Sequence, residues 1–329
     1  MKRLLSLALA IVVLGSGPAL ADPPYKLTMA GASPGGVWSV IGHGVDSAVA
    51  AAYPGSVITY QTSGGGLANI ALIDQHKVPL ALAVDGELML AREGRPPFKH
   101  KIESSRAVAF VAGWLPMFMA VNKSFADKYG IATLEDLAKK KPPARIAVNR
   151  RGNVASMIAE TMLKHAGASF ADIEKAGGNI VYAASAEAAS LMTDGRIDMI
   201  FNMLPVGHSS LRQVEQSVEL VELGVSKEVS EKSAKEMGVE LFTIPAGKPH
   251  KWVTQDVTVP SQGSVLIASK DMDDKTAYNL AKGITENLDK IRAAHPSLKP
   301  LTKEYIVSLK VAPYHPGAIK YYKEAGLMK

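Results

Sequence analysis

The sequence contains no cysteine, few aromatic residues and, beyond its first residues, no long apolar run. Without cysteine there can be no disulfides and no thiolate metal sites, so a hydrophobic core must stabilise the fold. Aromatic residues make up 6% of the chain and do not alternate with basic ones, so we expect no nucleic-acid partner. The formal net charge of +6 permits a bias toward anionic solutes but does not require one.

The first residues have the pattern of a secretory signal peptide. Lys2 and Arg3 are followed by the apolar stretch Leu4–Leu14, which is too short to span a bilayer, and by the small-x-small motif Ala19-Leu20-Ala21. This pattern predicts a signal peptide of residues 1–21, cleavage before Asp22 and export to the periplasm. An uncleaved anchor is the alternative, and a lipid anchor is excluded because no cysteine follows the apolar stretch.

The chain continues as alternating strands and helices. The predicted strands Tyr25–Met29, Ser56–Tyr60 and Pro79–Val84 each precede an apolar pattern of helical spacing, and Asp85-Gly86 is predicted as a turn between the third strand and its helix. Repeated strand–helix units predict a parallel sheet with helices on its faces. In such sheets ligands bind beyond the carboxyl ends of the strands, where the loops converge.

A second set of strand–helix units follows between residues 145 and 202, and two apolar stretches, Val108–Asn122 and Val257–Ser269, flank it. We therefore predict an α/β protein of the two-lobed clamshell type, each lobe a mostly parallel sheet flanked by helices. Residues 22–116 begin lobe I, residues 117–256 form lobe II, and residues 257–329 complete lobe I. The helical spacing from Ala277 to Ile291 predicts one continuous helix.

The glycine-rich segment Gln61–Asn69 is the clearest candidate for a binding site. It lies between a predicted strand and a predicted helix, where glycines let backbone N–H groups approach a ligand and the helix start favours an anion. A small anionic solute, a carboxylate or phosphate, is therefore the expected partner; an ordinary turn is the alternative. The expected contacts come from this segment and from the similar loop after the first strand: Thr62, Ser63, Gly64, Gly65 and Asn69, with Ser33, Gly35 and Gly36.

Charged residues at two further loops complete the candidate site. Arg150 or Arg151 could bind a carboxylate with its guanidinium, or both could be solvated. Asp85 could bind an ammonium group, repel a second carboxylate or cap the next helix, and capping is the commonest role of such a residue. Trp38 and Trp114 could line the pocket, although core packing is the more usual role.

The sequence lacks the patterns of a metal or cofactor enzyme. The eight histidines show no metal-binding spacing, no Gly-x-Ser-x-Gly motif is present, and Gly31–Gly36 does not match a dinucleotide-binding loop. We therefore expect no catalytic residues, metal or cofactor.

Four segments together resemble a known family, the TAXI-type solute receptors of TRAP transporters. These segments are Gly31–Trp38, Gln61–Asn69, Ala186–Asp198 and His315–Gly326, spread over nearly the whole mature chain. The resemblance implies a periplasmic binding protein of type II topology that delivers its ligand to a TRAP-type membrane permease. Two loops depart from the family pattern, Val84–Glu87 and Asn149–Ser156, so the ligand is expected to differ from the usual glutamate-like or oxo-acid ligands.

These observations predict a receptor that captures a small carboxylate (a dicarboxylate, an oxo-acid or an acidic amino acid) by closing its lobes. An exported lyase or dehydratase on the same scaffold is the first alternative, with Glu87 as its acid or base. A receptor coupled to a sensor kinase is the second, because fold alone does not separate transport from sensing.

Overall fold

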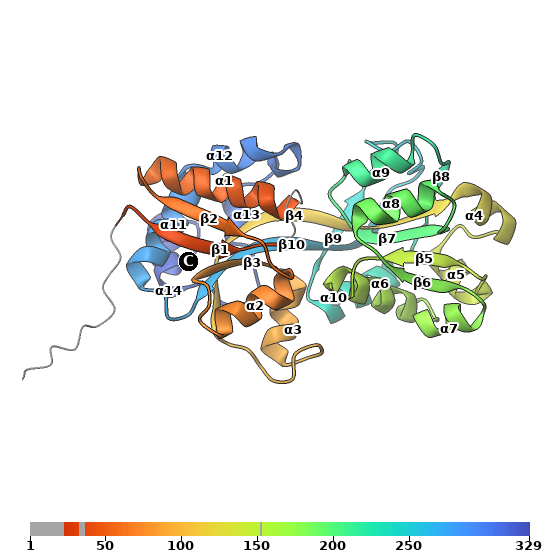
Figure 1. Cartoon of the computed structure of the whole chain (residues 1–329), viewed down its shortest axis with the longest axis horizontal. Coiled ribbons are helices and arrows are strands. Elements are labelled where there is room, and N and C mark those ends of the chain that lie inside the picture. Colours follow the sequence, from red (N-terminus) through yellow and green to blue (C-terminus); the bar gives the residue numbers. More distant parts are fainter. Residues whose placement is uncertain (1–22, 33–36, 152) are drawn as a thin grey trace, which may run out of the picture.

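The computed structural model describes residues 23–32, 37–151 and 153–329. The predicted signal peptide and the predicted contacts Ser33, Gly35 and Gly36 lie outside the described residues. Two bodies lie side by side and are joined by long strands (Figure 1). A ten-stranded sheet runs through both, with the path β2-β1-β3-β10-β4-β7-β5-β6. We call the body with β1–β3 lobe I and the body with β5–β7 lobe II.

Lobe I has the predicted strand–helix units. Its strands β1 (Lys26–Ala30), β2 (Val57–Gln61) and β3 (Leu80–Val84) pair in parallel. Each is followed by a helix: α1 (Val37–Ala52), α2 (Gly66–Asp74) and α3 (Asp85–Glu93). The chain ends in this lobe, with α11 (Asp274–Glu286), α12 (Leu288–Ala294), α13 (Lys303–Ile306) and α14 (Pro316–Glu324).

Lobe II repeats this build. Its parallel strands are β5 (Arg145–Val148), β6 (Asn179–Tyr182) and β7 (Met199–Met203). Two short strands, β8 (Leu220–Glu222) and β9 (Glu240–Ile244), pair with β4 and β10. The lobe II helices are α4 (Lys123–Tyr129), α5 (Leu134–Lys140), α6 (Val154–His165), α7 (Phe170–Lys175), α8 (Ser185–Thr193), α9 (Ser209–Val214) and α10 (Lys227–Met237).

Two antiparallel strands, β4 (Ser105–Asn122) and β10 (Val257–Ser269), connect the lobes. Strand β4 pairs with β10 up to Pro116 and with β7 from Met117 onward. The α/β clamshell fold class is therefore confirmed. The predicted domain boundaries at residues 117 and 257 remain a proposal, since these strands belong to both lobes.

Two local predictions were wrong. Asp85 and Gly86 were expected to form a turn, but helix α3 begins directly at Asp85. The helix predicted across Ala277–Ile291 is interrupted at Asn287, whose side-chain amide bonds to the Gly283 carbonyl and whose backbone leaves the helical region. The apolar spacing continues across this break because α11 and α12 both pack on the core.

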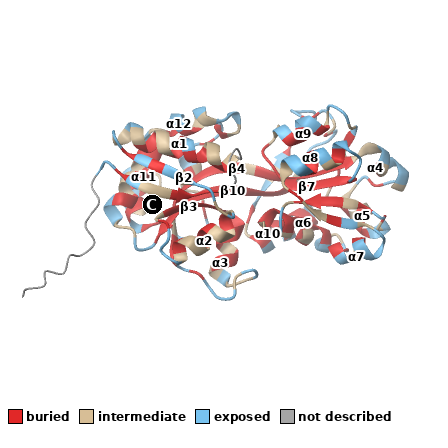
Figure 2. Cartoon of the chain, in the orientation of Figure 1, coloured by how far each residue is buried: buried red, intermediate tan, exposed pale blue. Residues whose placement is uncertain are grey.

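The buried residues form a continuous core along the sheet, and exposed residues lie on the outer helices and loops (Figure 2). Among the described residues, no helix combines the length and apolar character needed to cross a bilayer.

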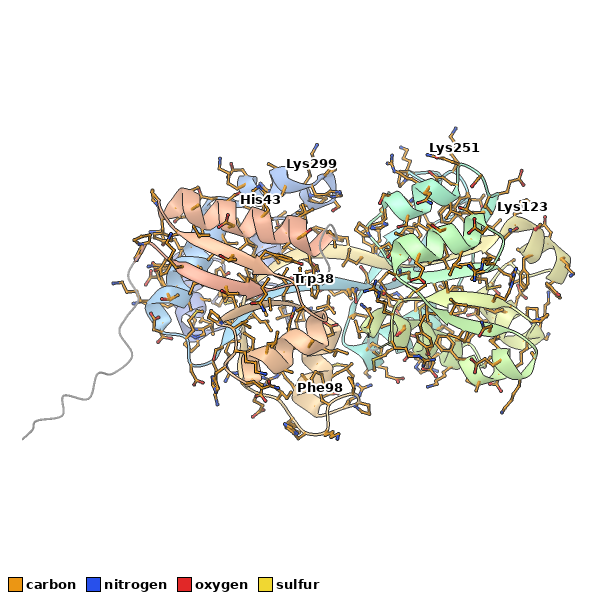
Figure 3. The ribbon with its side chains drawn as sticks, in the orientation of Figure 1. Trp38, His43, Phe98, Lys123, Lys251 and Lys299 are labelled. Carbon is orange, nitrogen blue, oxygen red and sulfur yellow. The ribbon has the colours of Figure 1, made fainter. Side chains whose placement is uncertain are left out.

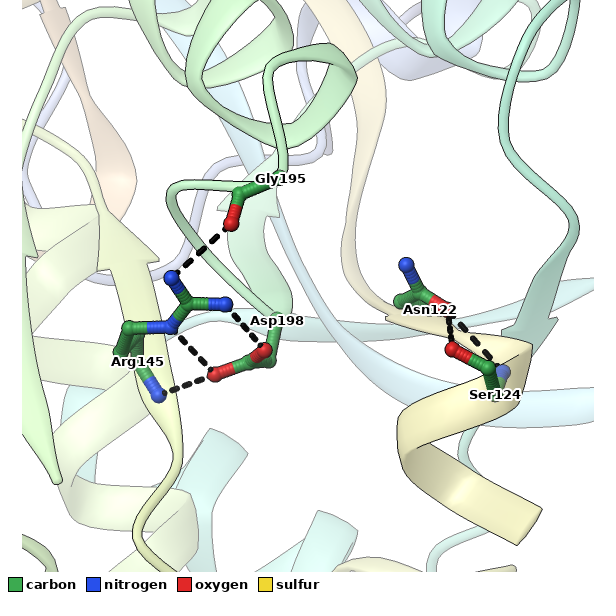
Figure 4. Close-up of polar contacts among 5 residues, drawn as sticks. All are labelled: Asn122, Ser124, Arg145, Gly195 and Asp198. Atoms are coloured by element: carbon green, nitrogen blue, oxygen red, sulfur yellow. Dashed lines mark hydrogen bonds and ion pairs between the residues drawn. The ribbon is translucent and has the colours of Figure 1, made fainter. Parts of the chain in front are cut away.

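Asp198, in the segment Ala186–Asp198, has a structural role in lobe II. Arg145 donates to it from Nε (2.9 Å) and Nη2 (2.7 Å) and to the Gly195 carbonyl from Nη1 (2.9 Å), which ties β5 to the start of β7 (Figure 4).

The terminal segment beginning at His315 also packs as structure. Tyr322 is fully buried and donates to the Val108 carbonyl at 2.6 Å. A Cβ on Gly317 would come within 2.0 Å of the Asp274 carbonyl oxygen, so glycine is needed where α14 meets α11. Tyr321 and Tyr322 thus belong to a packed helix.

Candidate functional site

The predicted glycine loop lies at the carboxyl end of β2, and part of it is open to solvent. Thr62 and Gly64 are exposed, and Gly65 is half-buried with φ of 97° and open space where a Cβ would stand. The positive φ explains the glycine at this position, since an L side chain would be strained there. Thr62, Gly64 and Gly65 are therefore available to a ligand.

The other polar residues of this loop bond within the protein. Asn69 is fully buried, and its Nδ2 lies 3.2, 2.7 and 2.6 Å from the carbonyl oxygens of Ala30, Gly31 and Leu82. The Ser63 hydroxyl lies 2.6 Å from both Asn69 Oδ1 and the Gly31 carbonyl. Both side chains tie the glycine loop to the ends of β1 and β3, which is a positioning role.

The amino-terminal end of α2, predicted to bind an external anion, holds one of the protein's own carboxyl groups. Glu87 is 3% exposed, and its Oε2 accepts the Val84 N–H at 3.0 Å. The carboxyl also accepts the Leu67 N–H, and a Cβ on Gly66 would lie 1.6 Å from Oε2. Gly66 is thus required by Glu87, and the helix N-terminus stabilises this internal group.

Glu87 should make stability depend on pH. Burial raises its pKa to about 7, against the lowering effect of the two backbone hydrogen bonds. The folded state therefore holds a proton that the unfolded chain releases near pH 4.5, so stability is lost as pH rises from about 4.5 to 7. Glu87 should account for about 3 kcal/mol of this fall in the free energy of unfolding, and Glu87→Gln should abolish that part of it. Urea unfolding at each pH measures the difference. Equal pH slopes for the two proteins would contradict this assignment.

Asp85 lies beside Glu87 but faces the strand that connects the lobes. It is 3% exposed, and both carboxyl oxygens lie 3.3 Å from the Gly263 N–H of β10. Its Oδ1 also accepts the Gly86 N–H at 2.9 Å. Burial, only partly offset by these bonds, raises its pKa well above the usual range. The helix cap is made by Glu87 at the Val84 N–H, rather than by Asp85 as expected.

The arginine pair follows β5 in lobe II, and both residues are exposed. The Arg151 guanidinium carbon lies 3.9 Å from the centre of the Tyr182 ring, a cation–π contact that holds this side chain beside the end of β6. The N–H groups along the edge of a guanidinium stacked in this way remain able to bind a carboxylate. Arg150 has no such ring contact among the described residues.

A polar network behind this loop was missed from the sequence. Asn202 is buried at the end of β7; its Oδ1 accepts from Asn149 Nδ2 at 3.1 Å, and its Nδ2 donates to Ser185 Oγ at 3.0 Å. These bonds join the carboxyl ends of β5 and β7 to the start of α8. An asparagine inside the otherwise apolar run Met199–Leu204 was the available signal, because a buried amide needs partners.

The lobes already touch on one side, through α3 and α10. Arg95 Nη1 donates to the Glu236 carbonyl at 2.8 Å, and a Cβ on Gly86 would come within 2.8 Å of the Met237 carbonyl oxygen. This contact brings the carboxyl ends of the β3 and β5 units toward each other. Trp38 lies at the edge of lobe I nearest lobe II (Figure 3), and its Nε1 donates to Ser264 Oγ of β10 at 2.9 Å.

The donor set does not describe a metal centre. Within the described ranges, no three or more His, Asp or Glu side chains are grouped so that they could hold a metal ion. The candidate residues offer backbone N–H groups and hydroxyls at the strand ends of lobe I and exposed guanidinium groups in lobe II, and two buried carboxyl groups, Asp85 and Glu87, lie in the first turn of α3.

Residues 29–326 match the NMT1-like family, which covers both lobes and the strands that connect them. The chain belongs to the NMT1-like family. This NMT1-like protein also resembles several solved structures. Because their sequence identity to it is low, the resemblance shows a shared fold and nothing more.

One such structure, described as a periplasmic transporter, is 16% identical over 93% of this chain and 94% of its own, with a TM-score of 0.53. MatC from Rhodopseudomonas palustris with bound malate is 15% identical over 84% and 90%, with a TM-score of 0.53. A TctC solute-binding protein from Polaromonas is 16% identical over 91% and 95%, with a TM-score of 0.51.

Proposed function

We propose that this NMT1-like protein is a periplasmic receptor that binds a small carboxylate between its lobes and passes it to a membrane permease. The observation that carries the proposal is the placement of Arg151, stacked on Tyr182 at a strand end of lobe II. The strand ends of lobe I offer the open loop Thr62–Gly65. A carboxylate held by N–H groups of one lobe and a guanidinium of the other would favour the closed form, because both contacts exist only there.

The proposed contacts are Thr62, Gly64 and Gly65 from lobe I and Arg151 from lobe II. Arg150 and Asp85 stay in the proposed site as neighbours of these groups, and Ser63 and Asn69 as positioning residues. The malate of MatC is a small dicarboxylate, which fits this class of ligand. We further propose a TRAP-type permease as the partner, because four segments of the sequence resemble TAXI-type receptors of TRAP transporters.

Binding rather than catalysis is favoured by the position of Glu87. The enzyme alternative needs this residue as an acid or base, yet its carboxyl group is buried and accepts two backbone N–H groups. A group held in this way is poorly placed to exchange protons with a solute in the interlobe space.

A thermal-shift screen of dicarboxylates, oxo-acids, aromatic acids and acidic amino acids tests the proposal. At a hundredfold excess over its dissociation constant, a ligand should add about 2.7 kcal/mol to the free energy of unfolding. The ligand should also be recovered unchanged after long incubation. Stabilisation by a neutral or cationic solute, with no shift for any carboxylate, would contradict the proposal.

A further inference from the structure

Strand β4 contains a bulge where it passes between the lobes. Leu115 pairs with Gln262 and Ala112 with Ser264, so Gly113 and Trp114 together stand opposite Gly263. Trp114 has φ of 63°, in the left-handed region that bulky residues rarely adopt. Bulges re-aim side chains and are common beside functional sites, and such strain persists only where the surrounding structure imposes it.

The bulge places Trp114 at the outer end of a stack of three rings. Its ring lies 4.6 Å from that of Tyr305 at 27°, and Tyr305 lies 4.6 Å from Phe110 at 22°. Phe110 is buried, whereas Tyr305 and Trp114 are half-buried. No hydrogen bond found within the described residues uses Trp114 Nε1, so this indole can still donate to a ligand.

Two glycines are needed for this stack. A Cβ on Gly113 would lie 2.2 Å from the Tyr305 hydroxyl oxygen, and a Cβ on Gly263 would lie 2.2 Å from the Phe110 ring. The bulge and the stack therefore depend on each other. A half-buried tryptophan held in a strained conformation by this much local structure is poorly explained by core packing alone.

The stack also lies next to the proposed binding site. Asp85 accepts the N–H of Gly263, the residue opposite the bulge. Burial raises the pKa of Tyr305, and the charges of Glu240 and Asp85 raise it further. The bulge itself lies within four residues of Met117, where β4 changes from the lobe I sheet to the lobe II sheet.

We propose that the outer face of Trp114 is a platform for the flat body of the solute, so that the receptor prefers an aromatic carboxylate. This rests on the proposed function and names its substrate class. An aromatic ring would continue the stack in offset geometry, as aromatic side chains do with each other. Its carboxylate would point toward the Arg151 loop and away from the buried carboxyl groups Asp85 and Glu87.

Calorimetric titration with benzoate and with malate tests the proposal. Benzoate should bind the unaltered protein at least about tenfold more tightly than malate, and Trp114→Gly should weaken benzoate binding by about tenfold. Malate affinity should change less than about twofold, because malate has no ring to stack. Glycine is chosen because φ of 63° is unstrained for it, so the substitution adds no backbone strain, and the retained malate affinity reports that the fold is kept.

Trp252→Phe is the matched control, because Trp252 lies in lobe II and bonds to Glu215 there. It should leave both affinities unchanged. Benzoate should also change the intrinsic tryptophan fluorescence of the unaltered protein and of Trp252→Phe, but not of Trp114→Gly. Tighter binding of malate than of benzoate, or equal weakening of both in Trp114→Gly, would overturn the aromatic preference and leave the carboxylate receptor standing. Failure of every carboxylate to bind would overturn both.

Discussion

Asn69→Leu is expected to lower the free energy of unfolding by about 3 kcal/mol. Leucine has a similar volume but donates nothing, so the carbonyl groups of Ala30 and Leu82 lose the Asn69 donor in a fully buried position, and the Gly31 carbonyl keeps only the Ser63 hydroxyl. Each buried polar group that loses a hydrogen bond costs about 1 kcal/mol. Urea unfolding at constant pH measures the loss.

Thr62→Ala is the matched control for Asn69→Leu. Thr62 lies in the same loop but is exposed, so its removal should change stability by less than about 0.5 kcal/mol. Ser63→Ala should fall between them, since its hydroxyl has partners but is less buried. If Asn69→Leu unfolded at the same urea concentration as Thr62→Ala, the positioning role assigned to Asn69 would be contradicted.

Arg151→Ala is expected to weaken binding of the captured carboxylate by roughly ten- to a hundredfold. Removing the guanidinium removes a charged hydrogen bond of about 1.5–3 kcal/mol. Arg151→Lys should recover only part of the affinity, because an ammonium neither stacks flat on Tyr182 nor bonds a carboxylate with two parallel N–H groups. Calorimetry with the best carboxylate of the screen measures each affinity.

Arg150→Ala is the control for Arg151→Ala, because it removes the same charge from the same loop but leaves the contact with Tyr182. It should cost no more than about threefold, through long-range electrostatics alone. If the two alanine variants bound equally well, the side chains would act only as diffuse charge and neither would touch the solute.

Hydrophobic periodicity predicted the strand–helix units of both lobes because each buries one apolar face in a regular pattern. It did not predict the helix break at Asn287, since an apolar stripe on two consecutive helices looks the same as one on a single helix. The capping box of Thr133 with Asp136 can be read directly from the sequence, because the two residues are three positions apart. The bulge at Trp114 was not, because it depends on the register between strands more than a hundred residues apart.

The candidate site shows the same limit. A glycine loop before a helix predicts an anion at the helix N-terminus, and the structure does have a carboxyl group there. That group belongs to Glu87 of the next helix. Sequence spacing cannot show whether such an anion is a ligand or part of the chain, since this depends on how α3 packs beside α2.

The central claim is that a carboxylate draws the two lobes together, and a distance between the lobes tests it most directly. Lys299 on lobe I and Lys251 on lobe II are exposed at the upper edges of the two bodies (Figure 3). The natural chain has no cysteine, so Lys299→Cys with Lys251→Cys gives two unique sites for spin labels. Double electron–electron resonance should show a shorter, narrower distance distribution when the bound carboxylate is added, and Arg151→Ala should need more ligand to reach it. An unchanged distribution at a ligand concentration that calorimetry shows to be saturating would contradict closure between the lobes.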